Sequence, residues 1–266
     1  MALLNFDFFS NVLGMGMQAS IILPESTIGQ IGMEGISSST YPTLYLLHGM
    51  SDDHTTWIRR TSIERYVSSR NIAVVMPSTH LGWYTDTTYG MKYFTYLTCE
   101  LPEICQHFFK GMSDRREDTY IAGLSMGGYG ALKAALTFPE KYASAASLSG
   151  AVDLTSAIQA SSQILAKSES MASYWTGLFG NISQIQGSNH DLFYLAEICA
   201  QAEKKPRIFQ WCGTEDPLLD SNRKMKNKLS ELEYDLTYSE SYGEHSWLYW
   251  DQQIQNVLSW LDAGQS

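Results

Sequence analysis

Basic residues are scarce in this sequence. Its 266 residues include 18 Lys and Arg against 28 Asp and Glu, which gives a net charge of −10 and a pI near 5.0. A protein that binds nucleic acid needs clustered positive charge to displace the counterions of the phosphate backbone. The sequence therefore predicts no nucleic-acid partner.

Long apolar runs are also lacking, and the first basic residue is Arg59. A membrane-spanning helix needs roughly 20 apolar residues, and a secretory signal begins with a basic segment. The cysteines show neither CxxC spacing nor the density of a disulfide scaffold; they are Cys99, Cys105, Cys199 and Cys212. We expect free thiols, no membrane insertion and a cytoplasmic location. A homo-oligomer is compatible with the sequence, which does not fix the oligomeric state.

Apolar segments of strand length alternate with longer helical patterns, as in an α/β protein whose mostly parallel sheet carries helices on both faces. The first two predicted strands, 3–9 and 16–23, form an antiparallel edge, and a hairpin or loop follows over 26–40. The remaining predicted strands are 43–47, 72–76, 119–122, 143–148, 207–212 and 235–239, and the predicted helices are 56–69, 92–109, 126–138, 221–232 and 247–262. Because no repeat or low-complexity linker interrupts the pattern, we expect a single domain over 1–266 with a helical insertion at about 151–205, after the sixth strand.

The strongest motif is Gly123-Leu-Ser125-Met-Gly127, placed between a predicted strand and a predicted helix. A G-x-S-x-G sequence in that position is typical of the sharp turn that presents the nucleophile of an α/β-hydrolase. The glycines relieve crowding around a strained serine, and the helix that follows directs free N–H groups toward a developing oxyanion. The motif predicts Ser125 as a nucleophile, although a glycine-rich turn that binds phosphate, or no ligand at all, has the same letters.

A serine hydroxyl needs a base, and the base needs an orienting acid. In this fold class they follow the serine in the order acid, then histidine. Only His190 and His245 come after Ser125, and His245 is the better candidate because it lies between the last strand and the closing helix. Asp216 follows the preceding strand and is the predicted acid, with neighbouring Glu215 and Asp220 as alternatives.

The second oxyanion donor is expected in the loop after strand 43–47, where Gly49 allows the backbone to approach a substrate closely. The backbone amides of Met50 and Met126 are the predicted oxyanion donors. The neighbouring cluster of His48, Asp52, Asp53 and His54 matches no zinc or calcium template, so we predict no metal site.

These segments together resemble a known family. Leu-Leu-His48-Gly-Met, Gly-Leu-Ser125-Met-Gly-Gly-Tyr-Gly-Ala, Gly-Thr-Glu-Asp216 and Gly-Glu-His245-Ser-Trp are similar to the esterase D / S-formylglutathione hydrolase-like group of α/β-hydrolases. Within that group the chain is most similar to bacterial tributyrin and acetyl esterases, with feruloyl and acetyl-xylan esterases as further relatives. One departure is Ser51-Asp52, where S-formylglutathione hydrolases have threonine and cysteine.

The resemblance implies a serine carboxylesterase that needs no cofactor and hydrolyses short-chain acyl esters, such as acetyl or butyryl esters, through an acyl-enzyme on Ser125. Acetylated sugars and feruloyl esters are within its expected range. The nearest alternative is a thioesterase of the S-formylglutathione hydrolase type. An acyltransferase shares the same residues, and a non-catalytic binding protein on a hydrolase scaffold is a more distant alternative.

Several aromatic residues are candidate walls of the substrate pocket, in part through residues 174–179 of the insertion. They are Trp57, Trp83, Trp175, Phe179 and Trp247. For each of them, packing in the hydrophobic core is the alternative role.

Overall fold

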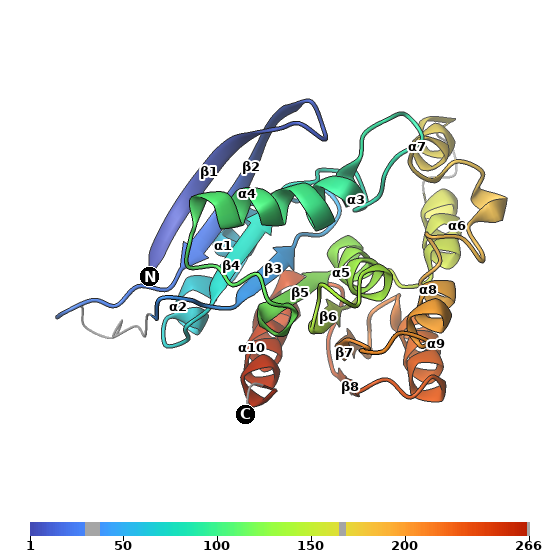
Figure 1. Cartoon of the computed structure of the whole chain (residues 1–266). Helices are drawn as coiled ribbons and strands as arrows, with labels where there is room; N and C mark the ends of the chain where they lie inside the picture. The colour runs from blue at the N-terminus through green and yellow to red at the C-terminus, as the bar shows by residue number, and fades with distance from the viewer. Residues whose placement is uncertain (30–37, 165–168, 265–266) are drawn as a thin grey trace.

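An eight-stranded sheet forms the centre of the computed structural model, which describes residues 1–29, 38–164 and 169–264 (Figure 1). The strand order is β1-β2-β4-β3-β5-β6-β7-β8; β1 and β2 pair antiparallel with their neighbours, and all other pairs are parallel. The strands are β1 Ala2–Ser10, β2 Met15–Leu23, β3 Thr43–Leu47, β4 Ala73–Pro77, β5 Thr119–Leu124, β6 Ser144–Leu148, β7 Arg207–Gly213 and β8 Leu236–Ser241. The predicted sheet is confirmed.

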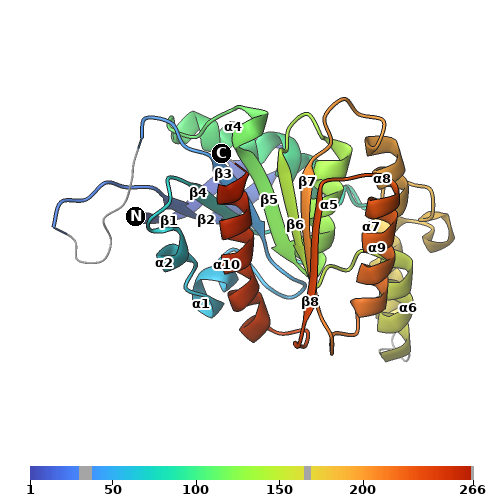
Figure 2. The same cartoon turned by 90° about the horizontal axis from the view of Figure 1, so that it is seen from below.

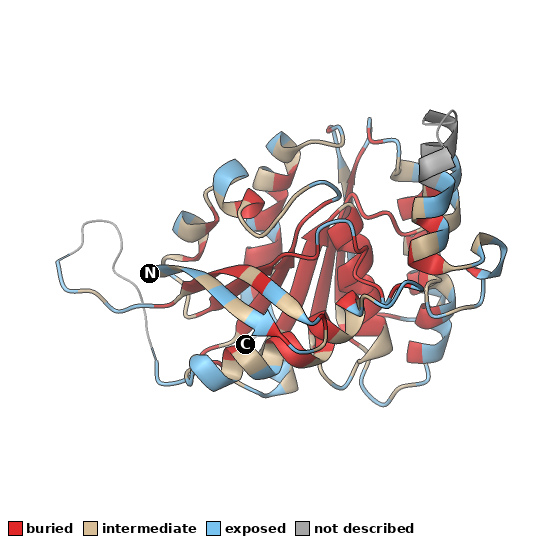
Figure 3. Cartoon of the chain, turned by 90° about the horizontal axis from the view of Figure 1, so that it is seen from above, coloured by how far each residue is buried: buried red, intermediate tan, exposed pale blue. Residues whose placement is uncertain are grey.

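Helices cover both faces of the sheet because side chains of the central strands alternate between two apolar layers. One layer packs against α1 (Thr56–Arg60), α2 (Ile63–Val67) and α10 (Trp247–Ala263), and Figure 2 shows α10 lying across this face. The other layer packs against α4 (Leu101–Phe108), α5 (Met126–Thr137), α8 (Leu192–Cys199) and α9 (Leu219–Glu231). Figure 3 shows that the central strands are buried along their length.

The insertion between β6 and β7 is helical, as expected. It contains α6 (Leu154–Ile164), α7 (Glu169–Phe179), a short 3₁₀ turn (η3, Ile182–Gln184) and α8, which packs against α5. Of the predicted loop at 26–40, residues 30–37 lie outside the described residues.

No helix in the described part of the chain combines the length and the apolar character needed to cross a membrane.

Two predicted helices are wrong in detail. The helix predicted over 56–69 is two helices, because Thr61 adopts an extended conformation and its hydroxyl bonds the Trp57 carbonyl oxygen. The helix predicted over 92–109 is a short helix α3 (Tyr93–Thr95), a π-helical turn η1 (Tyr96–Glu100) and α4. Pro102 lies in the first turn of α4 and has no N–H to donate to the Thr98 carbonyl, so the regular hydrogen-bond ladder is interrupted there.

The order of the strands reverses between β3 and β5. From β3 the chain moves outward to β4 on one side, and it then returns to place β5 on the other side of β3. In open parallel sheets, ligands bind beyond the carboxyl ends of the strands at such a switch point. The loop that begins at His48 follows β3 and Ser125 follows β5, so the topology brings both to this position.

Substituting Gly127 tests the close packing of α5 on the sheet. A Cβ at Gly127 would lie 2.5 Å from the Leu47 carbonyl oxygen and 2.7 Å from the His48 carbonyl oxygen, and backbone atoms cannot rotate away. We expect Gly127→Ala to lower the free energy of unfolding by at least about 1–3 kcal/mol in urea denaturation. Gly16→Ala is the matched control, because a Cβ there has no neighbour within 4 Å. Equal stability of the two variants would contradict the packing argument.

A buried lysine connects α5 to the insertion. Lys133 is 2% exposed; its Nζ donates to Thr85 Oγ1 over 2.8 Å and lies 3.3 Å from His190 Nδ1. Among the described residues it forms no ion pair with a carboxylate. Burial lowers the pKa of Lys133 to about 7. Burial, followed by the Lys133 charge, likewise lowers the pKa of His190 to about 4.

Lys133 therefore makes stability depend on pH above neutrality. An unfolded chain keeps this amine protonated up to about pH 10.4, whereas the folded protein releases the proton near pH 7, so the cost of the buried charge is present below pH 7 and disappears as pH rises. Relative to Lys133→Met, the wild type should gain unfolding free energy from pH 7 to 9, by up to about 1.4 kcal/mol per pH unit. Lys224→Met, on the exposed side of α9, is the control and should show no such trend. Parallel pH profiles for wild type and Lys133→Met would refute the assignment.

Candidate active site

Ser125 stands at the junction of β5 and α5 in a strained backbone conformation. Its φ is 51° and its ψ is −116°, a region that residues other than glycine rarely adopt. The turn is tight enough that a Cβ at Gly123 would lie 2.4 Å from the carbonyl group of Gly127. The two glycines of the motif are therefore required by the turn, which leaves the serine side chain partly exposed at the end of the sheet.

The structure brings three of the predicted residues into one hydrogen-bonded chain. His245 Nε2 lies 3.0 Å from Ser125 Oγ, and His245 Nδ1 lies 2.9 Å from Asp216 Oδ2. Because a carboxylate can only accept, Nδ1 carries the proton and Nε2 is free to accept the serine proton. This is the arrangement of a nucleophile, a general base and an orienting acid.

Asp216 is held as a carboxylate. Burial by itself raises the pKa of this group, but hydrogen bonding and charge from His245, the Leu218 amide and the Ser149 hydroxyl outweigh burial and leave its pKa below the ordinary value. The alternative acids Glu215 and Asp220 are exposed.

The rejected histidine, His190, lies in the insertion. There its Nδ1 is 3.1 Å from Thr85 Oγ1 and 3.3 Å from Lys133 Nζ. His190 thus belongs to a different polar cluster from Ser125, and its side-chain contacts are to Lys133 of α5 and to Thr85 in the loop between β4 and α3.

Two loops carry the acid and the histidine, and they meet backbone to backbone. A Cβ at Gly213, the last residue of β7, would lie 2.2 Å from the Gly243 carbonyl oxygen, and the Glu215 amide donates to that same oxygen over 2.9 Å. This contact sets the relative positions of Asp216 and His245. Glycine at position 213 allows the approach.

Two residues that sequence reasoning missed support the histidine and the acid. The Trp250 ring meets the His245 ring edge-on, with centroids 4.9 Å apart, and Trp250 Nε1 donates to Ser149 Oγ over 3.1 Å. Ser149 follows β6, has a φ of 48° and also hydrogen-bonds Asp216. The only sequence signal for Ser149 is its place just after a buried strand, which is shared by many residues without such a role.

The two predicted oxyanion amides flank Ser125. Met126 is the first residue of α5, and Met50 follows Gly49, where a Cβ would lie 3.8 Å from Ser125 Cβ. Within the described residues, neither amide donates a hydrogen bond to the protein. By contrast, the Ser125 amide donates to the Leu148 carbonyl oxygen. Two free donors thus lie beside the serine.

His48 holds the loop that contains Met50. It is 1% exposed; its Nδ1 bonds the Gly49 carbonyl oxygen over 2.7 Å, and its Nε2 accepts from the Thr79 amide over 3.1 Å. Burial lowers the pKa of His48 to about 4, so the ring is neutral near neutral pH. Both ring nitrogens are occupied, and the described part of the chain has no group of three or more His, Cys, Asp or Glu side chains arranged for a metal ion.

Most of the candidate pocket aromatics lie in the protein interior. Trp57 is fully buried and donates from Nε1 to the Leu47 carbonyl oxygen. Trp83, Trp175 and Phe179 are at most 5% exposed and pack edge-on or stacked against one another. Their burial favours packing over substrate contact. Trp247 is partly exposed, at the start of α10, and packs edge-on against Trp57.

Comparison with known proteins identifies the family of the chain. The chain matches the model of the Esterase family, described as "Putative esterase", over residues 10–261. It is 29% identical to an acetyl esterase of Caldicellulosiruptor saccharolyticus over 263 residues, 98% of each chain.

Two solved structures from Staphylococcus aureus, each 32% identical with 98% of both chains covered, are similar throughout. They are the fluorophosphonate-binding serine hydrolase F, with a TM-score of 0.83, and an S-formylglutathione hydrolase, with a TM-score of 0.81. The protein thus has the α/β-hydrolase fold and is a serine carboxylic-ester hydrolase that belongs to this esterase family.

Proposed function

We propose that the protein hydrolyses short-chain acyl esters through an acyl-enzyme on Ser125. The observation that carries the proposal is the continuous chain from Ser125 Oγ through His245 to Asp216, with bonds of 3.0 and 2.9 Å. The similarity to an acetyl esterase along the full chain supports a small acyl group.

In the proposed reaction, His245 accepts the Ser125 proton as Oγ attacks the ester carbonyl carbon. The free amides of Met50 and Met126 donate to the oxyanion of the tetrahedral intermediate. His245 then returns the proton to the leaving alcohol. Water repeats the sequence on the acyl-enzyme and releases the acid. Asp216 remains ionised throughout and stabilises the imidazolium that forms twice per cycle.

The second candidate is hydrolysis of a glutathione thioester, which the similarity to an S-formylglutathione hydrolase favours. The same residues would attack a thioester. Against this, Asp52 places a half-buried carboxyl group beside Gly49 in the proposed oxyanion loop. Burial raises the pKa of Asp52, yet whenever it ionises it repels the carboxylates of glutathione. A neutral ester avoids this repulsion.

The proposed nucleophile and substrate class are tested with p-nitrophenyl esters from acetate to octanoate, compared with S-formylglutathione. We expect the shortest esters to turn over fastest and Ser125→Ala to lose on the order of 10⁶-fold in kcat, as in other serine hydrolases. Intact-mass spectra of the wild type, quenched during butyrate turnover, should show one butyryl group on Ser125. Preference for S-formylglutathione would select the second candidate, and full activity of Ser125→Ala would refute both.

The role of Asp216 is tested by Asp216→Asn, which keeps the shape but favours the wrong histidine tautomer. We expect kcat to fall by about 10⁴-fold, as for the analogous change in a serine protease triad. Glu215→Gln and Asp220→Asn are matched controls on either side and should remain within a few-fold of wild type. If Glu215→Gln lost as much activity as Asp216→Asn, the acid would be misassigned.

A further inference from the structure

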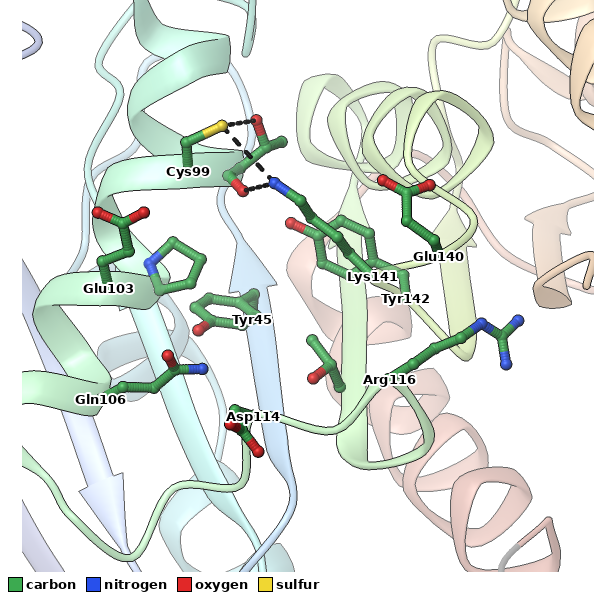
Figure 4. Close-up of a pocket in the computed structure, with 12 residues that line it drawn as sticks. Tyr45, Cys99, Glu103, Gln106, Asp114, Arg116, Glu140, Lys141 and Tyr142 are labelled. Atoms are coloured by element: carbon green, nitrogen blue, oxygen red, sulfur yellow. Dashed lines mark hydrogen bonds between the residues drawn. The ribbon is translucent and has the colours of Figure 1, made fainter.

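A second pocket lies at the other end of the sheet from Ser125. It has a volume of about 270 Å³ and opens between α4 and the segments that lead into β5 and β6 (Figure 4). Thr119, which lines it, begins β5, so the pocket and Ser125 are separated by the length of that strand, about 20 Å at 3.3 Å per residue. The pocket is thus separate from the proposed active site and has room for a small molecule.

Two tyrosines, Tyr45 and Tyr142, line this pocket, and their hydroxyl groups form no hydrogen bond with the described residues. Tyr45 is 3% exposed and Tyr142 is 1% exposed, and Figure 4 shows both among the side chains around the cavity. Within the described residues, neither hydroxyl has a hydrogen-bond partner. Neither oxygen is among the fully enclosed polar atoms that lack a partner, so both can be reached from the cavity. The two hydroxyls are therefore available to hydrogen-bond a polar occupant of the pocket.

The pocket also contains the accessible thiol of the protein. Of the four cysteines, all within the described residues, Cys99 alone is not buried. Its Sγ lies 3.7 Å from Lys141 Nζ, which is placed to donate a hydrogen bond to the sulfur. Lys141 Nζ is held by the Thr98 carbonyl oxygen over 3.0 Å, the group that Pro102 leaves without a helical partner. The ammonium group is thus fixed beside the thiol by the irregular turn between η1 and α4.

Charged groups of both signs line the pocket. Lys141 and the two phenol hydroxyls can donate to a carboxylate, while Glu103 and Asp114 on the rim form no hydrogen bond or ion pair within the described residues and can accept from an ammonium group. A ligand that pairs with the donors and with the two carboxylates carries one negative and one positive charge, as a zwitterionic amino acid does.

We propose that Cys99 is a modification site that forms a mixed disulfide with a small zwitterionic thiol. The co-reactant is the disulfide of that thiol. The Cys99 thiolate attacks one sulfur of the disulfide, a new S–S bond forms, and the original S–S bond breaks. The departing half leaves as a thiolate and takes a proton from water. Cys99 is oxidised, the departing half is reduced, and no other oxidant is needed. The inference is independent of the esterase assignment.

The experiment uses the full native chain and cystine, the disulfide of the simplest zwitterionic thiol. Intact-mass spectrometry follows the addition of one cysteinyl group with time, and peptide mapping locates it. We expect one adduct, on Cys99, that excess reduced cysteine removes. Cys99→Ser should give no adduct, and the matched control Cys199→Ser, at a buried cysteine, should react like wild type.

A second experiment tests whether the pocket recognises the charged groups of cystine or whether Cys99 reacts only because its thiol is exposed. Tyr142→Phe removes one proposed donor to the carboxylate and should slow the reaction with cystine by about tenfold. Its reaction with the uncharged bis(2-hydroxyethyl) disulfide should be unchanged. If Tyr142→Phe does not fold, as judged by circular dichroism, Tyr45→Phe serves in its place.

Two results would overturn the proposal. The first is that native protein gives no adduct with cystine while urea-unfolded protein does. The second is that the phenylalanine variant and wild type react equally fast with cystine, which would make Cys99 an ordinary exposed thiol.

Discussion

The close approach of α5 to the ends of β3 and β5 is the constraint on which the rest of the site depends. Leu47 and Gly123 are register partners in the sheet, and Gly127 packs against the Leu47 carbonyl oxygen without room for a Cβ. At this tight junction Ser125 has a positive φ, and the free amide of Met126 begins α5 directly after it. The strain at the serine is small beside the burial of α5 on both sheet and insertion, so the fold can maintain it.

A second backbone contact has the same role for the acid and the base. Gly213 and Gly243 bring together the loops after β7 and β8, although Asp216 and His245 lie far from Ser125 in the sequence. The sheet supplies the coarse arrangement, since β5, β6, β7 and β8 are consecutive neighbours whose carboxyl ends meet at one edge. The precise positions of Ser125, Asp216 and His245 depend on the contacts of Gly127 and Gly213, where two backbone segments touch without a side chain between them.

The sequence predicted the sheet and the three hydrogen-bonded residues because both follow from order along the chain. Strand-length apolar runs locate the strand ends, and Asp216 and His245 follow the right ends, although Glu215 shares the first of them and is excluded only by its exposure. Pro102 interrupts one predicted helix because it has no N–H to donate, and Thr61 ends another through a bond from its side chain to the backbone. A periodic pattern of apolar residues does not reveal either effect. Trp83 could not be assigned to core or pocket, because an aromatic side chain suits both and only its position between Tyr129 of α5 and Trp175 of α7 decides.

His48 shows how a residue outside the hydrogen-bonded chain can control the proposed chemistry. The Gly49 carbonyl and the Thr79 amide determine its tautomer, since a carbonyl only accepts and an amide only donates. The Gly49 carbonyl and the Met50 N–H belong to one planar peptide, so a bond that fixes the carbonyl also fixes the direction of the N–H. A neutral, buried imidazole therefore orients the proposed oxyanion donor. Because the pKa of His48 lies near 4, the ring stays neutral and this orientation persists at neutral pH.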